Sequence, residues 1–146
     1  MPKKMNVVLI NPPAEKNLEK WDAPEHPNIS LAYLEGFLKK NSIPCKVIDS
    51  KFEKINLEEV LRRLKNEKFD IVGLTSMTHD VGQAANIAGI IKNRFSGTKV
   101  IIGGVHVTAL PYETLKRFNE FDLAIIGEGE YTLFEVIKTL REKKSL

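Results

Sequence analysis

Five short runs of apolar residues alternate along the chain with segments in which apolar positions recur every three to four residues. The runs are rich in Val and Ile and occupy residues 5–11, 45–49, 69–75, 98–104 and 121–127. In the first, third and fourth runs almost every position is apolar, which is typical of strands covered on both faces of a parallel sheet. The pattern therefore predicts five β-strands, three of them covered on both faces.

The segments between the runs have the periodicity of amphipathic helices. They predict helices at residues 29–41, 56–67, 80–95 and 133–140. In the second helix Asn56 precedes Glu59 by three residues, which is a capping-box pattern. Asp80 and Gln83 form a similar pair at the start of the third helix, ahead of a stripe of mainly small apolar residues. Small residues permit that helix to pack closely on a sheet.

Regular alternation of strands and helices predicts an α/β fold with right-handed crossovers. We expect a flavodoxin-like (Rossmann-like) parallel sheet of five strands, in the order 2-1-3-4-5, with helices on both faces. The 146 residues form one domain, 1–146. Ligands of such folds bind outside the carboxyl ends of the strands. The loops after Asn11, Thr75, Gly104 and Gly127 are therefore the places to look, and the irregular segment 11–28 is expected to be functional or mobile.

Composition narrows the function classes. The net charge is +3, and the 22 basic residues are mixed with 19 acidic ones, so we expect no nucleic-acid partner. No apolar run is long enough to cross a membrane, and the N-terminus lacks a cleavage-site pattern, so no membrane insertion is predicted. Cys45 is the only cysteine, which excludes an internal disulfide and favours a cytoplasmic setting.

Polar and glycine residues follow the third and fourth strands. Thr75 and Ser76 offer hydroxyl groups to a ligand, or they serve the start of the next helix. Gly103 and Gly104 either supply a backbone conformation that a turn needs or let a bulky group approach the backbone. His106 follows closely, and a lone histidine is more often a hydrogen-bonded packing residue than a metal ligand.

The fifth strand ends in Gly127-Glu128-Gly129-Glu130. A pyrophosphate cradle would need a third glycine and no acidic residues in the loop, because carboxylates repel phosphates. We therefore exclude a dinucleotide site. Glu128 is suited to accept hydrogen bonds from amides or hydroxyls, and Glu130 suits the first turn of the following helix.

Several other sites are excluded by the residues at the strand ends. A phospho-receiver domain needs acidic residues after the first strand, an aspartate after the third and a lysine after the fifth. This chain has Asn11-Pro12, Thr75-Ser76 and Gly127-Glu128 there. It has no P-loop, nucleophile elbow, flavodoxin-type phosphate loop or two-histidine metal motif, and its three histidines show no supporting spacing.

Three stretches together resemble a known family: "DIVGLTSMTHD", "VIIGGVHVTALPYETL" and "DLAIIGEGEYTLFEVI". They are similar to the cobalamin-binding N-terminal domain of radical S-adenosylmethionine enzymes. Those enzymes include cobalamin-dependent methyltransferases and the anaerobic magnesium-protoporphyrin ester cyclase. The shared pattern is Gly-Gly-x-His-x-Thr, a proline, and Gly-Glu-Gly-Glu about twenty residues later. The similarity extends from about Met5 to Leu140.

The resemblance implies that this chain binds cobalamin and contributes no catalytic residue or metal ligand of its own. The cofactor-binding residues it implies are Thr75, Ser76, Met77, Gly103, Gly104, Val105, His106, Gly127, Glu128 and Gly129. Related mutase domains have Asp-x-His-x-x-Gly after the first strand, with the histidine on cobalt. Here Asn11-Pro12-Pro13-Ala14 stands in that place. We therefore expect cobalamin in its base-off form, without a histidine ligand from that position.

The catalytic half of these enzymes holds an iron–sulfur cluster on Cys-x-x-x-Cys-x-x-Cys, which Cys45 alone cannot supply. We expect the chain to be an excerpt of a longer enzyme. Its C-terminal partner would be a radical S-adenosylmethionine domain with a [4Fe–4S] cluster and S-adenosylmethionine, and the enzyme would be a methyltransferase or an oxidative cyclase. The alternative is a degenerate domain that no longer binds cobalamin and serves docking or substrate recognition. A nucleotide or FMN module lacks the necessary phosphate-binding groups.

Overall fold

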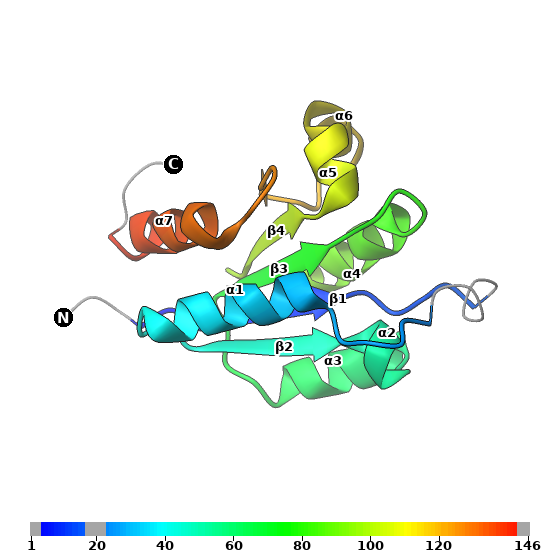
Figure 1. Ribbon diagram of the computed structural model, residues 1–146, viewed down its shortest axis with the longest axis horizontal. Coiled ribbons are helices and arrows are strands. Elements are labelled where there is room, and N and C mark those ends of the chain that lie inside the picture. Colours follow the sequence, from blue (N-terminus) through cyan, green and yellow to red (C-terminus); the bar gives the residue numbers. More distant parts are fainter. Residues whose placement is uncertain (1–3, 17–22, 143–146) are drawn as a thin grey trace.

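Five parallel strands form the sheet in the order β2-β1-β3-β4-β5, as the alternation of strands and helices predicts (Figure 1). The computed structural model describes residues 4–16 and 23–142. The strands are β1 (Val7–Asn11), β2 (Cys45–Asp49), β3 (Ile71–Thr75), β4 (Lys99–Gly103) and β5 (Leu123–Ala124). Because the chain passes from β1 to β2 on one side and then to β3 on the other, the strand order reverses between β1 and β3. A crevice at such a reversal is the usual ligand site of this architecture.

The register brings the strand ends together at one edge. Asn11 pairs with Asp49, and Thr75 pairs with Gly103. Two residues before the end of β1, Leu9 pairs with Gly73 of β3. Gly73 pairs in turn with Ile101 of β4, so these three residues form a row across the middle of the sheet. The row lies just below the edge at which the predicted site residues gather.

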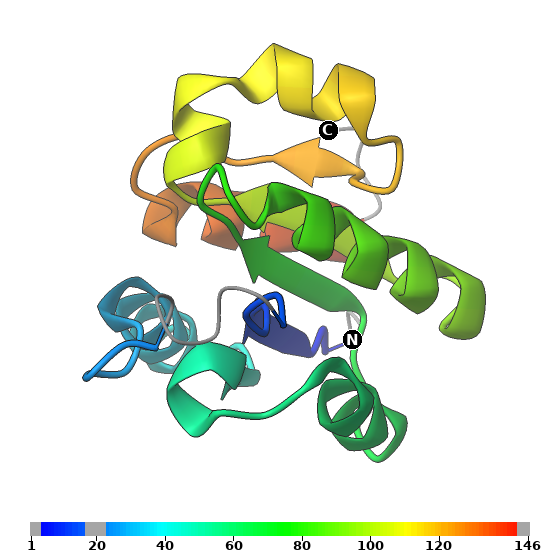
Figure 2. The same ribbon diagram turned by 90° about the vertical axis from the view of Figure 1, so that its right-hand side faces the viewer.

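Helices cover both faces of the sheet. Those predicted from the periodicity are α1 (Ile29–Lys40), α3 (Leu57–Lys65), α4 (Val81–Arg94) and α7 (Glu130–Arg141). Viewed onto the carboxyl ends of the strands, α1 and α7 lie on one side and α3 and α4 on the other (Figure 2). The segment 17–22 of the long first loop lies outside the described residues, so the prediction for 11–28 is tested only in part.

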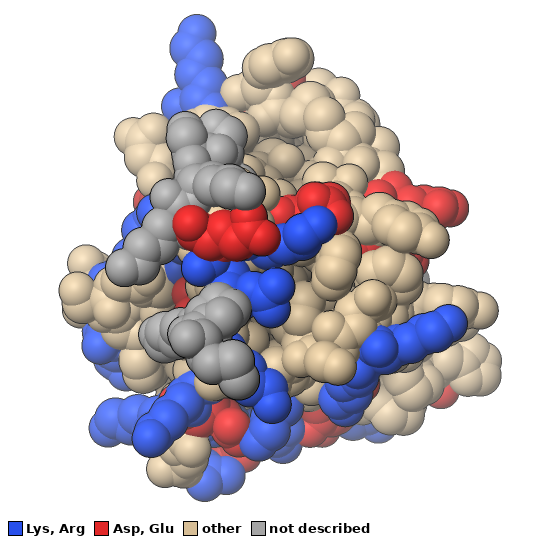
Figure 3. All heavy atoms as spheres, turned by 90° about the vertical axis from the view of Figure 1, so that its left-hand side faces the viewer, with Lys and Arg blue, Asp and Glu red and all other residues tan. Residues whose placement is uncertain are grey.

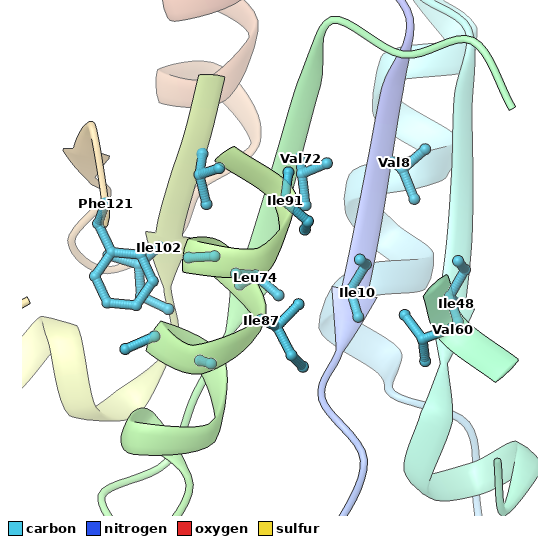
Figure 4. Close-up of a cluster of buried hydrophobic side chains, with 14 of the residues drawn as sticks. Val8, Ile10, Ile48, Val60, Val72, Leu74, Ile87, Ile91, Ile102 and Phe121 are labelled. Carbon is cyan, nitrogen blue, oxygen red and sulfur yellow. The ribbon is translucent and has the colours of Figure 1, made fainter. Parts of the chain in front are cut away.

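The core under α3 and α4 is formed by alternate residues of the central strands (Figure 4). Val8 and Ile10 of β1 point to this face, together with Val72 and Leu74 of β3. The small residues of α4, such as Ala84 and Ala88, are completely buried against it. Their size lets the helix axis approach the strands, as the small-residue stripe predicts.

Three short helices were not predicted: α2 (Ser50–Glu53), α5 (Val105–Ala109) and α6 (Pro111–Arg117). Pro111 occupies the first turn of α6, where its missing N–H costs no hydrogen bond. The fifth strand is much shorter than the predicted run 121–127. Only Leu123 and Ala124 pair with β4, because the following residues leave the edge of the sheet toward α7.

The two predicted capping boxes have different outcomes. Asn56 caps α3 as expected, since its Oδ1 accepts the Glu59 N–H at 3.0 Å. The prediction for Asp80 is wrong, because this residue precedes α4 but its side chain makes no capping hydrogen bond to the helix. Its carboxylate instead accepts the Met77 N–H at 2.6 Å and the Lys51 ammonium group at 2.5 Å. A buried cation attracts the carboxylate more strongly than the helix N–H groups do.

The surface carries charges of both signs. On the face opposite the strand carboxyl ends, Lys and Arg side chains lie interspersed with Asp and Glu side chains (Figure 3). Within the residues that the structure describes, no helix has the length and apolar character needed to cross a membrane.

Candidate cofactor site

A cleft of about 990 Å³ opens at the carboxyl edge of the sheet, on the face covered by α1 and α7. Nine of the ten residues predicted to bind a cofactor line it. They are Thr75, Ser76, Met77, Gly103, Gly104, Val105, Gly127, Glu128 and Gly129. They come from the ends of β3, β4 and β5, so the register of the sheet brings together residues that are distant in sequence.

The row of Leu9, Gly73 and Ile101 contributes to the wall that the sheet presents to the cleft. Gly73 has no side chain to project into this space. A Cβ atom at that position would lie 2.7 Å from Cδ2 of Leu9. Glycine in the middle of a strand often marks a place where another group approaches the backbone closely. Gly73 is not among the residues predicted from the sequence, although a glycine inside an apolar strand is a usable signal.

Gly104 fixes the ends of β3 and β4 against each other. Its φ of +102° lies in a region that favours glycine, and a Cβ there would lie 2.6 Å from the carbonyl oxygen of Ser76. This close approach lets Ser76 N–H donate to the Gly103 carbonyl at 3.1 Å. The His106 N–H donates to the Ser76 carbonyl at 3.3 Å. The backbone conformation expected of a turn glycine is therefore confirmed at Gly104, and the close contact there is made by the chain itself and not by a bound group.

The remaining cleft glycines are less constrained by neighbours. At Gly103 the nearest heavy atom to an added Cβ is the Ile125 carbonyl oxygen, at 3.8 Å. Gly127 has a φ of +69° and open space around it. Its N–H donates to Oγ1 of Thr108 in α5 at 3.0 Å, which ties the loop after β5 to the helix after β4. The loop after β5 is thus held in place by the side chain of Thr108 in α5.

Ser76 lines the cleft and has a buried hydroxyl group without a hydrogen-bond partner. Its side chain is buried, with the residue 2% exposed, and its Oγ has no hydrogen-bond partner in the structure. A buried hydroxyl group without a partner destabilises a protein by about 1–3 kcal/mol. Thr75 beside it is half-buried and lines the same space. A ligand that hydrogen-bonds Ser76 would remove this penalty, so the site has the character of one built for a polar group.

His106 stands apart from the other predicted residues. It does not line the cleft, it is buried, and its Nδ1 lies 3.2 Å from Oγ1 of Thr78. This is the hydrogen-bonded packing role that a lone histidine usually has. Across residues 4–16 and 23–142, no group of three or more His, Cys, Asp or Glu side chains is arranged to hold a metal ion.

Two acidic residues line the cleft beside α7. Glu130 occupies the first turn of α7, as expected, where a carboxylate is stabilised by the helix dipole. Glu128 lies in the preceding loop and is exposed. Carboxylates here favour ligands with N–H or O–H donors over free phosphates, in agreement with the exclusion of a pyrophosphate cradle.

Residues of α1 complete the cleft and were not selected from the sequence. Ile29, Tyr33 and Leu34 line it, and the first two are 66% and 69% exposed. Exposed large apolar side chains beside a hollow are typical of a binding surface. The sequence contained a usable sign of this surface, because α1 is apolar over more of its circumference than packing on one sheet requires.

Cys45 lies far from this edge, at the start of β2. It is buried, and burial raises the pKa of its thiol to about 12. The thiol therefore stays protonated near neutral pH and is a poor metal ligand or nucleophile.

Curated relatives match most or all of this chain. A methyltransferase of Pyrococcus horikoshii, described as uncharacterized methyltransferase PH0819, is 31% identical over 99% of the chain. The anaerobic magnesium-protoporphyrin IX monomethyl ester cyclase of Rubrivivax gelatinosus is 27% identical over 73% of the chain. The chain spans 31% and 20% of the lengths of these two proteins.

Solved structures share the fold. The cobalamin-dependent S-adenosylmethionine radical enzyme OxsB, solved with aqua-cobalamin bound, superimposes with a TM-score of 0.80. It is 24% identical in sequence, and the match covers the whole of this chain and 20% of that one. A response regulator of Thermotoga maritima also matches, with a TM-score of 0.59, 21% identity and coverage of 92% of this chain and 96% of that one. At these identities the likeness concerns the fold alone.

The family model described as the B12 binding domain matches residues 23–137, which include α1, the three strand ends of the cleft and most of α7. By this match, the chain belongs to the B12-binding domain family.

Proposed function

We propose that this domain binds cobalamin with the nucleotide tail in the cleft and the corrin ring over the carboxyl ends of the strands. The observation that carries the proposal is the open cleft of about 990 Å³ with the unpartnered, buried hydroxyl of Ser76 in its wall. The cleft is not closed by its own side chains: Met77 and Val105 line it but are 50% and 67% exposed.

The residues of the chain bind and orient the cofactor. Ser76 and Thr75 hydrogen-bond the tail, and Gly73 and Gly103 leave room for it beside the sheet. Glu128 accepts hydrogen bonds from amide groups of the ligand. When bound, cobalamin supplies the reactivity of the bond between cobalt and its upper ligand, and the protein supplies position and surroundings.

We propose further that cobalamin is held base-off, with no histidine of this chain on cobalt. β1 ends at Asn11 and the chain continues as Pro12-Pro13-Ala14, so no histidine stands at the position of the Asp-x-His-x-x-Gly histidine. His106 is buried against Thr78, outside the cleft. Drawing the tail into the cleft removes its base from cobalt without requiring a replacement from the protein.

The domain is proposed to serve a radical S-adenosylmethionine domain in a longer protein that is a methyltransferase or an oxidative cyclase. Two observations support this: the curated relatives are named a methyltransferase and an ester cyclase, and the chain spans less than a third of their length. The structural neighbour OxsB is named a cobalamin-dependent S-adenosylmethionine radical enzyme. The iron–sulfur cluster and S-adenosylmethionine would belong to that partner domain. This chain alone would bind cobalamin without catalysing a reaction.

The proposed role of Ser76 is tested by comparing it with a second buried serine whose hydroxyl also lacks a hydrogen-bond partner. Ser50 and Ser76 are both buried and both have an Oγ without a hydrogen-bond partner, but Ser50 does not line the cleft. Ser76→Ala should weaken binding of hydroxocobalamin about fivefold to tenfold, because the hydrogen bond to the tail is lost. Ser50→Ala should bind as the unchanged protein does. Isothermal titration calorimetry measures both.

Equal affinity of the Ser76→Ala variant and the unchanged protein would contradict the role given to Ser76. If the unchanged, folded protein did not bind cobalamin at all, the docking or substrate-recognition alternative would be favoured instead.

A further inference from the structure

A second, smaller hollow of about 470 Å³ adjoins the cleft. The two share part of their lining, including Thr75, Ser76 and Met77. Asn11, Lys51 and Asp80 line the second hollow only. We call this hollow the polar pocket. The function proposed above assigns it no role.

Lys51 and Asp80 form an ion pair in the wall of the polar pocket. Both are buried, and Nζ of Lys51 lies 2.5 Å from Oδ2 of Asp80. The other oxygen of Asp80 accepts the Met77 N–H at 2.6 Å, so the pair also holds the turn that separates the pocket from the cleft. Because the two charges compensate each other, this wall favours a neutral polar group over a free anion or cation.

Asn11 at the end of β1 supplies an oriented amide. Its Nδ2 donates to Oδ1 of Asp49 at 2.8 Å, and a carboxylate can pair only with the nitrogen side of an amide, so the orientation is determined. The residue is buried. Within the described residues, Oδ1 of Asn11 receives no hydrogen bond. An amide acceptor on Asn11 thus lines the pocket together with Ser76, whose buried hydroxyl has no partner.

We propose that the polar pocket holds a propionamide arm of the corrin ring. This inference rests on the proposed function, because it concerns how the same cofactor is held. A primary amide is neutral and offers both N–H donors and a carbonyl acceptor. Its N–H donates to Oδ1 of Asn11, and its carbonyl accepts from the Ser76 hydroxyl, whose oxygen can still accept a hydrogen bond from the tail. The pocket lies beside the cleft, so one ligand can occupy both.

Cobalamin derivatives in which a single propionamide arm is hydrolysed to a carboxylate provide the test. The separate isomers are titrated into the unchanged protein alongside cobalamin itself. The isomer whose altered arm enters the polar pocket should bind at least about tenfold more weakly. Its carboxylate cannot donate to Asn11 and brings a negative charge close to Asp80. The other isomers should bind within about threefold of cobalamin.

A second readout follows Asn11 directly and needs no variant. The side-chain amide signals of Asn11 in nitrogen-15 NMR spectra should shift when methylcobalamin binds. Those of Asn41 should not, because Nδ2 of Asn41 donates to the Phe37 carbonyl at the far end of α1. Asn11→Ala should reduce the discrimination against the sensitive isomer to less than about threefold.

The outcomes separate the two proposals. If cobalamin and every isomer bind equally and the Asn11 signals do not move, the polar pocket holds water and the inference is overturned, while the proposed function stands. If cobalamin does not bind to the folded protein, the proposed function fails, and this inference fails with it.

Discussion

Glycines in the turns before and after β4 are required for different local reasons. Gly104 combines a positive φ with a close approach to Ser76, so it has two independent reasons to be glycine. Gly97, in the turn before β4, has a φ of +85° but open space where a Cβ would be placed. Alanine substitutions at Gly97 and Gly104 therefore separate two contributions to the loss of stability: the left-handed backbone conformation, and the contact of the new Cβ atom with the Ser76 backbone.

We predict that Gly97→Ala lowers the free energy of unfolding by about 1 kcal/mol, the cost of the left-handed conformation. Gly104→Ala should lower it by about 3 kcal/mol, because displacement of the Ser76 backbone is added. Urea denaturation measures both. Equal effects at the two positions would mean that the contact between the ends of β3 and β4 is looser than described.

The sequence located most of the cleft residues because the motifs stand at strand ends, where ligands of this fold usually bind. His106 is the one predicted residue that does not line the cleft, since it follows Gly-Gly by two residues but its side chain lies against Thr78. It did not find Gly73 or Tyr33, whose importance depends on which neighbours they face across the sheet. Only three-dimensional packing shows this.

Short elements position the loops of the site. Thr108 in α5 donates from Oγ1 to the Gly104 carbonyl at 2.9 Å and accepts the Gly127 N–H at 3.0 Å. One hydroxyl group thus connects the turn after β4 with the loop after β5. Thr139 in α7 also makes a side-chain hydrogen bond to the backbone, to the Glu135 carbonyl at 2.8 Å, but contacts no loop of the site by it.

We predict that Thr108→Val destabilises the protein by about 1 kcal/mol and increases hydrogen exchange at the Gly127 amide. Thr139→Val, the matched control, should leave that amide unchanged. Hydrogen exchange followed by NMR provides the measurement. Unaltered exchange at Gly127 in the Thr108 variant would show that the loop is held by other contacts.

The ion pair between α2 and the turn before α4 is a second connection between elements. Removing the cation by Lys51→Met leaves the carboxylate of Asp80 buried, which should lower the free energy of unfolding by about 3 kcal/mol. Adding Asp80→Asn should restore much of this loss, because the amide oxygen still accepts the Met77 N–H. Chemical denaturation of the single and double variants tests the pair. A loss below about 1 kcal/mol in the single variant would contradict this account.

Periodicity predicted the long helices but not α2, α5 and α6. These elements have four to seven residues, too few to show a repeat of 3.6. The capping-box spacing of Asp80 and Gln83 also predicted a hydrogen bond that the structure does not have. A local spacing cannot reveal that Lys51, which is 29 residues away, competes for the same carboxylate.

At the scale of the whole molecule, the alternation of apolar runs and amphipathic segments was sufficient for the fold. The predicted strand order places β1 and β3 side by side inside the sheet with helices on both faces, and the structure has that order. The same order brings the loop after β3 and the two glycine-containing loops after β4 and β5 to one edge. The fold alone does not determine the ligand, because response regulators share it. The cleft, Ser76 and the family match make cobalamin the ligand proposed here.

The most direct measurement of the central claim is an absorbance titration with methylcobalamin. The unchanged protein should convert the spectrum, with saturation, to the base-off form, because the cleft takes the tail. Gly103→Leu should abolish the change by filling the cleft, since an added Cβ meets only the Ile125 carbonyl, at 3.8 Å. Gly36→Leu, on the exposed side of α1, should behave as the unchanged protein. No spectral change with the folded protein, at concentrations well above micromolar, would contradict cobalamin binding through this cleft.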